Sequence, residues 1–142
     1  MNENARAAPP ASPVALSPGR LTWSVERREL LLFAVATVAV WAHTVDEMRI
    51  GEFVAVPFAT ANVALLGAWP RLRRTWRAWS AIAVGLFWGV TVIPYHVIPL
   101  LEGVMTHQNL SGLSRLLGAG VMFALGVAIL RGRDTSTGRV PG

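Results

Sequence analysis

The residues best suited to chemistry stand close together near the end of the first apolar segment. His43 is followed by Asp46 three residues later and by Glu47 four residues later. Residues at these spacings share one face of a helix, so an imidazole and two carboxylates would point the same way. An imidazole beside a carboxylate suits proton transfer near neutral pH. The same groups are also ligands for a divalent metal ion such as zinc.

A second imidazole, His96, lies between Pro94 and Pro99. Each proline lacks a backbone N–H and frees a carbonyl about one turn earlier. Irregular backbone at membrane depth is tolerated where it is buried in protein or lines a polar cavity, so we expect His96 to face the same site. The candidate catalytic residues are His43, Asp46, Glu47 and His96. The candidate ligands of a divalent metal are His43, Glu47 and His96.

A purely structural role is the alternative for the same residues. Asp46 and Glu47 would then mark a solvated helix end, and His43 would bond a neighbouring carbonyl. His96 would lie at the lipid headgroups on a kinked helix end. His107 belongs to a polar stretch, and we expect it to be an exposed loop residue.

The composition places these residues in a membrane protein. Of 142 residues, 53% are hydrophobic and 15% are charged, against about 25% charged in soluble domains. The chain has no cysteine, which excludes disulfides and thiolate metal ligands. All 13 basic residues are arginines, and they flank apolar segments instead of covering one face. A lipid bilayer is therefore the expected partner, and nucleic acid is not.

Four apolar segments follow a start rich in Ala, Pro and Ser. A helix needs about 20 apolar residues to cross a bilayer core. The expected spans are residues 27–47, 53–69, 78–101 and 112–131. They form one transmembrane domain, 23–133, between two tails expected to be disordered, 1–22 and 134–142. The predicted fold class is all-α, an integral membrane four-helix bundle.

Arginines predict the topology, because they are enriched in cytoplasmic loops. Three groups of them flank the N-terminus, the middle loop and the C-terminus, whereas the other two loops hold only Arg49 and Arg115. Four spans then place both termini in the cytoplasm, in a multi-pass protein of the cell membrane. Every histidine and four of the eight acids fall in the outward-facing layer. Trp69, Trp76 and Trp79 are expected at the inner interface.

Small residues indicate how the spans would pack, since close approach of helices in lipid needs them. The expected contacts are the Gly85–Gly89 pair, the Ala55–Ala59 pair and a stripe on the last span formed by Gly120, Ala124 and Ala128. Asn62, near the middle of the second span, is expected to make a hydrogen bond between helices.

The segment His43-Thr44-Val45-Asp46-Glu47 at the end of a first span resembles the HXXEE-motif family. These are small multi-span bacterial membrane proteins of unassigned function. Here Asp46 stands where the family has a glutamate, and the shorter carboxylate reaches less far. Asn62 and His96 continue the similarity loosely, over about residues 40–102. The resemblance implies a site at these residues and names no substrate.

Three functions fit the pattern. The first is a membrane enzyme or metal site that opens outward. The second is a small proton-coupled transporter, although the first span has no acid between Leu30 and His43, near the midplane where coupling sites lie. The third is a non-catalytic accessory subunit. A homo-oligomer is compatible with each, and the substrate, small molecule or lipid, is left open. Motifs of serine hydrolases, nucleotide-binding proteins and zinc proteases are missing.

Overall fold

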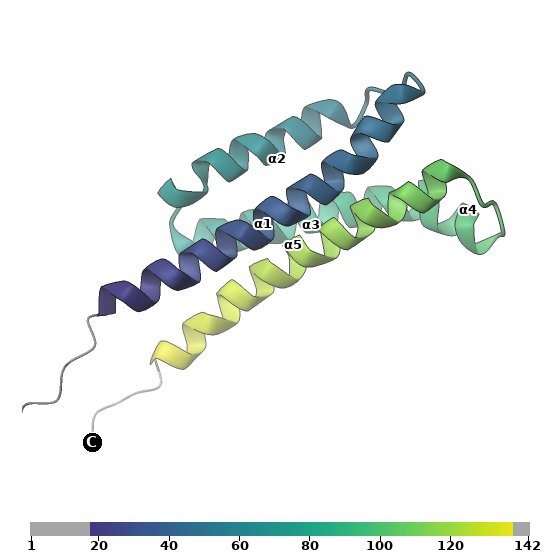
Figure 1. The fold of residues 1–142 in the computed structure, drawn as a ribbon. Helices are drawn as coiled ribbons and strands as arrows, with labels where there is room; N and C mark the ends of the chain where they lie inside the picture. Colours follow the sequence, from purple (N-terminus) through teal and green to yellow (C-terminus); the bar gives the residue numbers. More distant parts are fainter. Residues whose placement is uncertain (1–17, 138–142) are drawn as a thin grey trace, which may run out of the picture.

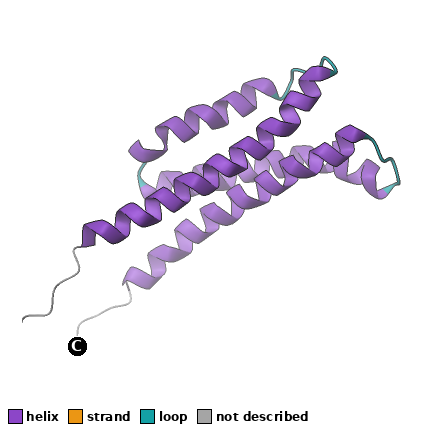
Figure 2. Ribbon diagram, viewed as in Figure 1, coloured by secondary structure: helices purple, strands orange, loops and turns teal. Residues whose placement is uncertain are grey.

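The computed structural model describes the backbone of residues 18–137 and the side chains of residues 25–132. Its elements are helices α1 (Pro18–Arg49), α2 (Val56–Ala68), α3 (Arg74–Val92), α4 (Ile98–Leu101) and α5 (His107–Thr137), with a 3-10 turn at Trp69–Arg71 and a π-helical turn at Ile93–Val97. The described residues hold no strand (Figure 2). Of the two expected tails, 1–17 and 138–142 lie outside the described residues, whereas 18–22 and 134–137 belong to α1 and α5.

The helices run alternately up and down, so the first residues of α1 and the last of α5 lie at one end (Figure 1). The α1–α2 connection and α4 lie at the other end. Helix α5 packs along both α1 and α3, whereas α2 packs mainly on α1. Every expected site residue comes from the end that holds the α1–α2 and α4–α5 loops.

Three helical segments are long and apolar enough to cross a membrane: Val25–Arg49, Arg74–Leu101 and His107–Gly132. The all-α architecture is therefore as predicted, with three such helices in the part of the chain that the structure describes. Helix α2 has 13 residues and a length of about 20 Å, against about 30 Å for a bilayer core. It is shorter than the expected span 53–69.

A buried stripe on α1 leads directly into the candidate site. Six of its buried residues recur every three or four positions: Glu29, Phe33, Ala36, Val40, His43 and Glu47, with buried Thr37 and Thr44 beside them. This spacing keeps them on one side of the helix, toward α5. Val35 and Val38 on the opposite side are 65% and 68% exposed, as suits a lipid-facing surface. His43 and Glu47 therefore point inward because they continue the apolar stripe.

Close helix packing uses some of the expected small residues, Gly85 and buried Ala59 among them, but not Gly89 or the stripe on the last span. A Cβ built on Gly85 would lie 2.6 Å from the backbone N of Phe123, whereas one on Gly89 or Gly120 meets nothing within 4 Å. Gly120, Ala124 and Ala128 are exposed. The predicted stripe on the last span was thus wrong in register, since α5 contacts α1 through Gly118 and α3 through Gly126.

Replacing Gly85 tests this packing. Gly85→Val places a side chain against the α5 backbone, which cannot move aside, so we expect the unfolding free energy to fall by about 1–3 kcal/mol. Gly120→Val is the matched control, because its side chain meets open space. Loss of helical signal during titration with a denaturing detergent measures both variants. Equal stability of the two variants would contradict the assignment of Gly85 as the close contact between α3 and α5.

Two further expectations differ from the structure. Trp69 is only 1% exposed and stacks on Phe33, with ring centroids 4.4 Å apart, so it is a core residue. Trp76 and Trp79 are exposed, as expected of interfacial residues. Asn62 is buried, but its Nδ2 has no hydrogen-bond partner within the described part of the chain, so the expected bond from this nitrogen is not seen.

Candidate metal centre

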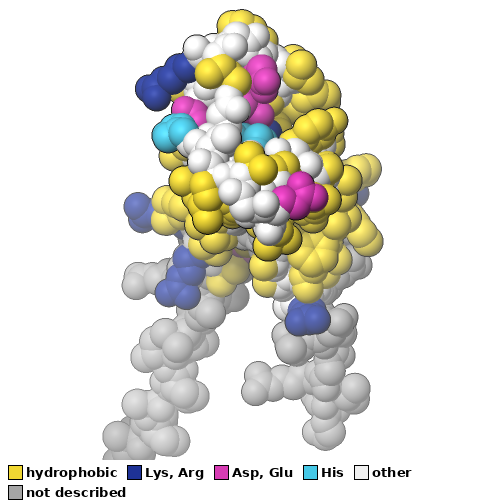
Figure 3. All heavy atoms as spheres, turned by 90° about the vertical axis from the view of Figure 1, so that its right-hand side faces the viewer, with side chains coloured by type: hydrophobic (Ala, Val, Ile, Leu, Met, Phe, Trp, Pro, Cys, Tyr) yellow, Lys and Arg dark blue, Asp and Glu magenta, His cyan; other side chains and the backbone are white. Residues whose placement is uncertain are grey.

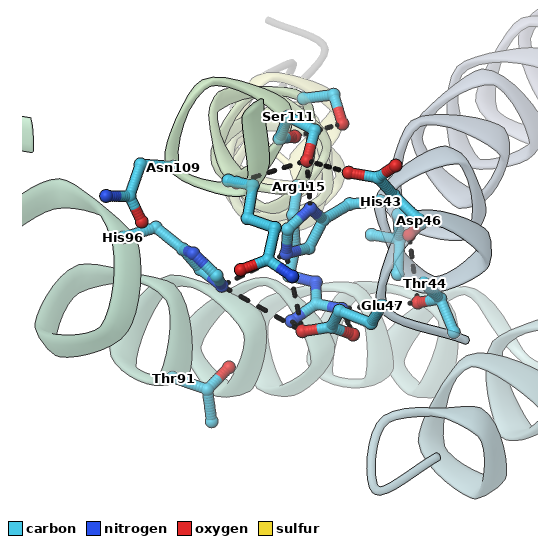
Figure 4. A network of polar contacts seen from close by, with 12 residues as sticks. His43, Thr44, Asp46, Glu47, Thr91, His96, Asn109, Ser111 and Arg115 are labelled. Carbon is cyan, nitrogen blue, oxygen red and sulfur yellow. Dashed lines mark hydrogen bonds and ion pairs between the residues drawn. The ribbon is translucent and has the colours of Figure 1, made fainter. Parts of the chain in front are cut away.

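Three potential ligand atoms converge between α1 and the π-helical turn (Figure 4). The Nε2 atoms of His43 and His96 are 3.0 Å apart. Glu47 Oε1 lies 3.3 Å from His43 Nε2 and 3.9 Å from His96 Nε2. Ligand atoms about 2.0–2.1 Å from a tetrahedral zinc ion lie about 3.3 Å from one another. The observed separations are close to one face of such a tetrahedron.

The local backbone explains how His96 reaches this position. Pro94 cannot continue α-helical hydrogen bonding, and the chain forms one π-helical turn over Ile93–Val97. Such turns are wider than an α-helical turn and recur at functional sites. A Cβ built on Gly112 would lie 2.7 Å from His96 Cβ, so α5 approaches this turn closely because position 112 has no side chain. Pro94 and Gly112 together direct His96 toward His43.

The Glu47 carboxylate is also held by Arg115 of α5. Arg115 Nη1 donates to Glu47 Oε1 over 3.0 Å, and Nη2 donates to Oε2 and, over 3.3 Å, to Thr44 Oγ1. The guanidinium lies over the ring of Trp88, 4.8 Å from its centroid. Glu47 and Arg115 are only 8% and 4% exposed. A paired carboxylate oriented in this way keeps one oxygen directed at the two imidazoles.

The other side of His43 contacts a second set of polar residues. His43 Nδ1 and Ser111 Oγ are 2.8 Å apart, and Ser111 Oγ donates to Asp46 Oδ2 over 2.7 Å. Asp46 Oδ2 also lies 3.0 Å from Nδ1 of His107, whose side chain is 80% exposed. Asp46 therefore points away from His96 and connects His43 to the protein surface.

These contacts assign the hydrogens of His43. Ser111 has one hydroxyl hydrogen, and the Asp46 carboxylate is the strongest acceptor within its reach. Ser111 Oγ must then accept from His43 Nδ1–H, which leaves a lone pair on His43 Nε2. Metal-bound histidines show the same pattern, donating the other ring N–H to a fixed acceptor. His43 Nε2 then either accepts from His96 Nε2–H over 3.0 Å, or both nitrogens bind one metal ion together with Glu47 Oε1.

A cavity of about 600 Å³ reaches this cluster from one side. Glu47, His96 and Arg115 line it, whereas fully buried His43 does not. Its other walls come from the residues before α2, from the first turn of α2 and from the second half of α3. They are Val54, Ala55, Phe58, Phe87, Trp88 and Thr91. A metal ion at the cluster would therefore have one side open to a cavity.

The structure thus brings together His43, Glu47 and His96, and places Asp46 beside them on the Ser111 side. His107 is exposed as expected, although it is the first residue of α5 and bonds Asp46. The sequence reasoning missed Arg115, which it counted only as a loop arginine, and Ser111. An available signal was the position of Arg115 inside an apolar segment, because a charge there requires a partner.

Replacing Ser111 tests its role as the partner of His43. Ser111→Ala removes the acceptor for Nδ1–H, and loss of such an outer contact lowers metal affinity by about 10–100-fold. Ser114→Ala is the matched control, since Ser114 Oγ bonds only backbone carbonyls, those of Ala39 and Ser111. Competition with a coloured chelator measures zinc affinity of the purified variants. Equal affinities would show that Ser111 does not position the imidazole.

Comparison with known proteins adds no relative. No family model matches the chain, and neither the curated proteins nor the solved structures contain a match.

Proposed function

We propose that this chain is a multi-pass membrane protein that binds one divalent transition-metal ion, Zn²⁺ by ligand type, through His43 Nε2, His96 Nε2 and Glu47 Oε1. The main support is that these three atoms lie close together, with pairwise distances of 3.0, 3.3 and 3.9 Å. Two imidazoles and one carboxylate form the ligand set of several catalytic zinc sites, which keep a fourth position open. The cavity beside Glu47 and His96 suits that fourth position.

The reaction class that this arrangement supports is metal-assisted hydrolysis. A zinc ion with three protein ligands lowers the pKa of bound water to about 7 and polarises carbonyl or phosphoryl oxygens. Within the protein, Ser111 and Asp46 orient His43, and Arg115 orients Glu47. Arg115 also cancels the charge of Glu47, so its positive charge opposes a dication. The test therefore begins with metal binding and not with activity.

Direct titration tests the metal centre. The full chain, purified in mild detergent and stripped with a chelator, is expected to take up about one equivalent of Zn²⁺ and to retain it through gel filtration. Mg²⁺ is expected not to compete, because it prefers oxygen ligands over imidazoles. No stoichiometric zinc after this treatment would remove the proposal.

A proton is the second candidate for the ion that the cluster of His43, Glu47 and His96 binds. Hydrogen-bonded contacts run from exposed His107 through Asp46 and Ser111 to His43. This connection favours the proton-coupled transporter over the accessory subunit if zinc does not bind. Proton flux in liposomes loaded with the metal-free protein separates the two, since an accessory subunit would carry none. The resemblance to the HXXEE-motif family remains a proposal; His43 Nε2 and Glu47 Oε1 of this motif lie 3.3 Å apart.

The topology proposal is four spans with both termini in the cytoplasm and the metal centre at the outer side. Acids and histidines gather on the end of the bundle shown in Figure 3, whereas Arg71 and Arg73, between α2 and α3, and Arg74, the first residue of α3, lie at the opposite end (Figure 1). Helices α1 and α3 run the same way in Figure 1. If both cross the bilayer, α2 must return the chain between them, with the 3-10 turn adding to its length.

Single cysteines test the topology in a chain that has none of its own. Ile50→Cys, before α2, is expected to react with a membrane-impermeant maleimide added outside intact cells. Arg73→Cys, after α2, is expected to react only once the cells are opened. Labelling of both positions from the same side would rule out α2 as a span.

A further inference from the structure

The cavity beside the cluster has two chemically different sides. On the α1 and α5 side it is lined by Glu47, Asn109 and Arg115, and His96 adds an imidazole. On the α2 and α3 side it is lined mainly by apolar and aromatic side chains. A cavity with one polar and one apolar side suits an amphiphile, and about 600 Å³ lies within the range of small-molecule sites.

The apolar side opens where the helices meet the bilayer. Val54 is 82% exposed, Tyr95 is 72% exposed and Phe58 is 47% exposed, and all three line the cavity. Helix α2 packs mainly on α1, and these exposed residues lie near the place where Phe58 contacts Phe87 of α3, at a ring-centroid distance of 4.8 Å. An occupant can therefore enter sideways from the lipid without crossing the aqueous surface.

The depth of the cavity also fits a lipid-like molecule. From His96 to Trp88 the lining covers about 12 Å along the helix axis at about 1.5 Å per residue. The polar residues Glu52 and Gln108 lie at the end that holds the loops, and Phe58, Phe87 and Trp88 lie farther along the helices. Arg115 lies as deep as Trp88, 4.8 Å from the centroid of its ring, so the polar and apolar linings face each other across the inner part of the cavity.

The charges at the inner end of the cavity decide which head group of an amphiphile it binds. Arg115 pairs with Glu47, and the metal ion of the proposed function would leave this end positive. The carboxylate of Glu52 belongs to an exposed residue of the α1–α2 loop. The geometry points to a binding site for one anionic single-chain amphiphile of the bilayer, with its carboxylate or phosphate beside His96 and Arg115 and its chain between α2 and α3. The negative charge expected for the head group rests on the proposed function, since the metal ion supplies the positive charge.

A photoreactive fatty acid tests this inference. The full chain is reconstituted into phosphatidylcholine vesicles with a fatty acid that carries a diazirine in its chain. Labelling is expected at the cavity residues Phe58, Phe87 and Thr91 and about tenfold weaker at Val35 and Val90, which are exposed and line no cavity in the described part of the chain. A fatty alcohol with the same diazirine is expected to label the cavity about tenfold less than the acid. Inorganic phosphate is expected not to compete.

Variants of the cavity wall provide the control. Ala55→Trp, at the residue before α2, fills the cavity and is expected to abolish its labelling, whereas Ala64→Trp, at an exposed position of α2 that does not line the cavity, keeps it. Thr91→Phe fills the cavity from α3 and covers the case in which Ala55→Trp does not fold. Even labelling of all lipid-facing residues, equal labelling by acid and alcohol, or competition by inorganic phosphate would overturn the inference.

Zinc content is measured on the same samples, so the two proposals fail separately. Cavity labelling without bound zinc removes the metal centre and retains the amphiphile site. Bound zinc with no preferred labelling removes the amphiphile site alone.

Discussion

His96→Ala is expected to lower the zinc affinity of the protein by more than about 100-fold. His96 provides one of three ligand atoms, with its Nε2 3.0 Å from that of His43. Loss of an outer contact to a ligand already costs about 10–100-fold, so loss of a ligand itself costs more. His43→Ala is expected to have the same effect and also leaves Ser111 without its imidazole partner. Zinc retained after dialysis, measured by elemental analysis, reports the change.

His107→Ala is the matched control for these variants. It removes an imidazole from the same end of the bundle, but one that is 80% exposed and bonded only to Asp46 in the described part of the chain. We expect zinc affinity to stay within a few-fold of that of the unaltered protein, as for a distant surface change. If His96→Ala retained zinc while His107→Ala lost it, the metal would lie at Asp46 and His107 instead.

Arg115→Ala is expected to reduce the unfolding free energy by about 3–5 kcal/mol. Arg115 makes a bidentate ion pair with Glu47, and both are buried between α1 and α5. Removing one partner leaves an unpaired charge in a medium that solvates it poorly. Arg115 also lies over Trp88, so truncation removes packing as well. Unfolding in mixed micelles, followed by the loss of helical signal, measures the difference.

The double variant Glu47→Gln with Arg115→Met separates the charge from the packing. Replacing both members of a buried pair by groups of similar volume is often neutral or stabilising. We therefore expect stability to return to within about 1 kcal/mol of the unaltered protein, while zinc binding is lost with the Glu47 carboxylate. A double variant as unstable as Arg115→Ala would indicate that Glu47 and Arg115 support the fold by other contacts.

Much of the architecture follows from local pattern. The apolar segments, their lengths and their flanking arginines predict membrane-crossing helices at α1, α3 and α5 without any knowledge of contacts. The α1 stripe that ends in His43 and Glu47 also follows from helical spacing. Pro94 and Pro99 predict a bend, and the structure has a π-helical turn at that place. These features depend on residues within about two turns of each other.

Other features depend on how separate helices meet. Which glycines contact a neighbour is an example: Gly85 touches α5 and Gly89 does not, although both occupy the same short motif. The rotation of each helix about its axis decides this, and that rotation is set by the packing of the whole bundle. The missed Arg115–Glu47 pair, 68 positions apart in the chain, has the same cause.

The amino-acid sequence by itself determined that apolar helices carry their histidines and several of their acids at one end, because helix periodicity and bilayer thickness act locally. Only the tertiary structure decided that His43 and His96 meet at 3.0 Å, that Asp46 bonds Ser111, and that Arg115 holds Glu47. These contacts join residues 53–68 positions apart. Their geometry depends on the close approach of α5 at Gly112 and Gly118, where the missing side chains leave room for the His96 side chain and for the α1 backbone at Ala36.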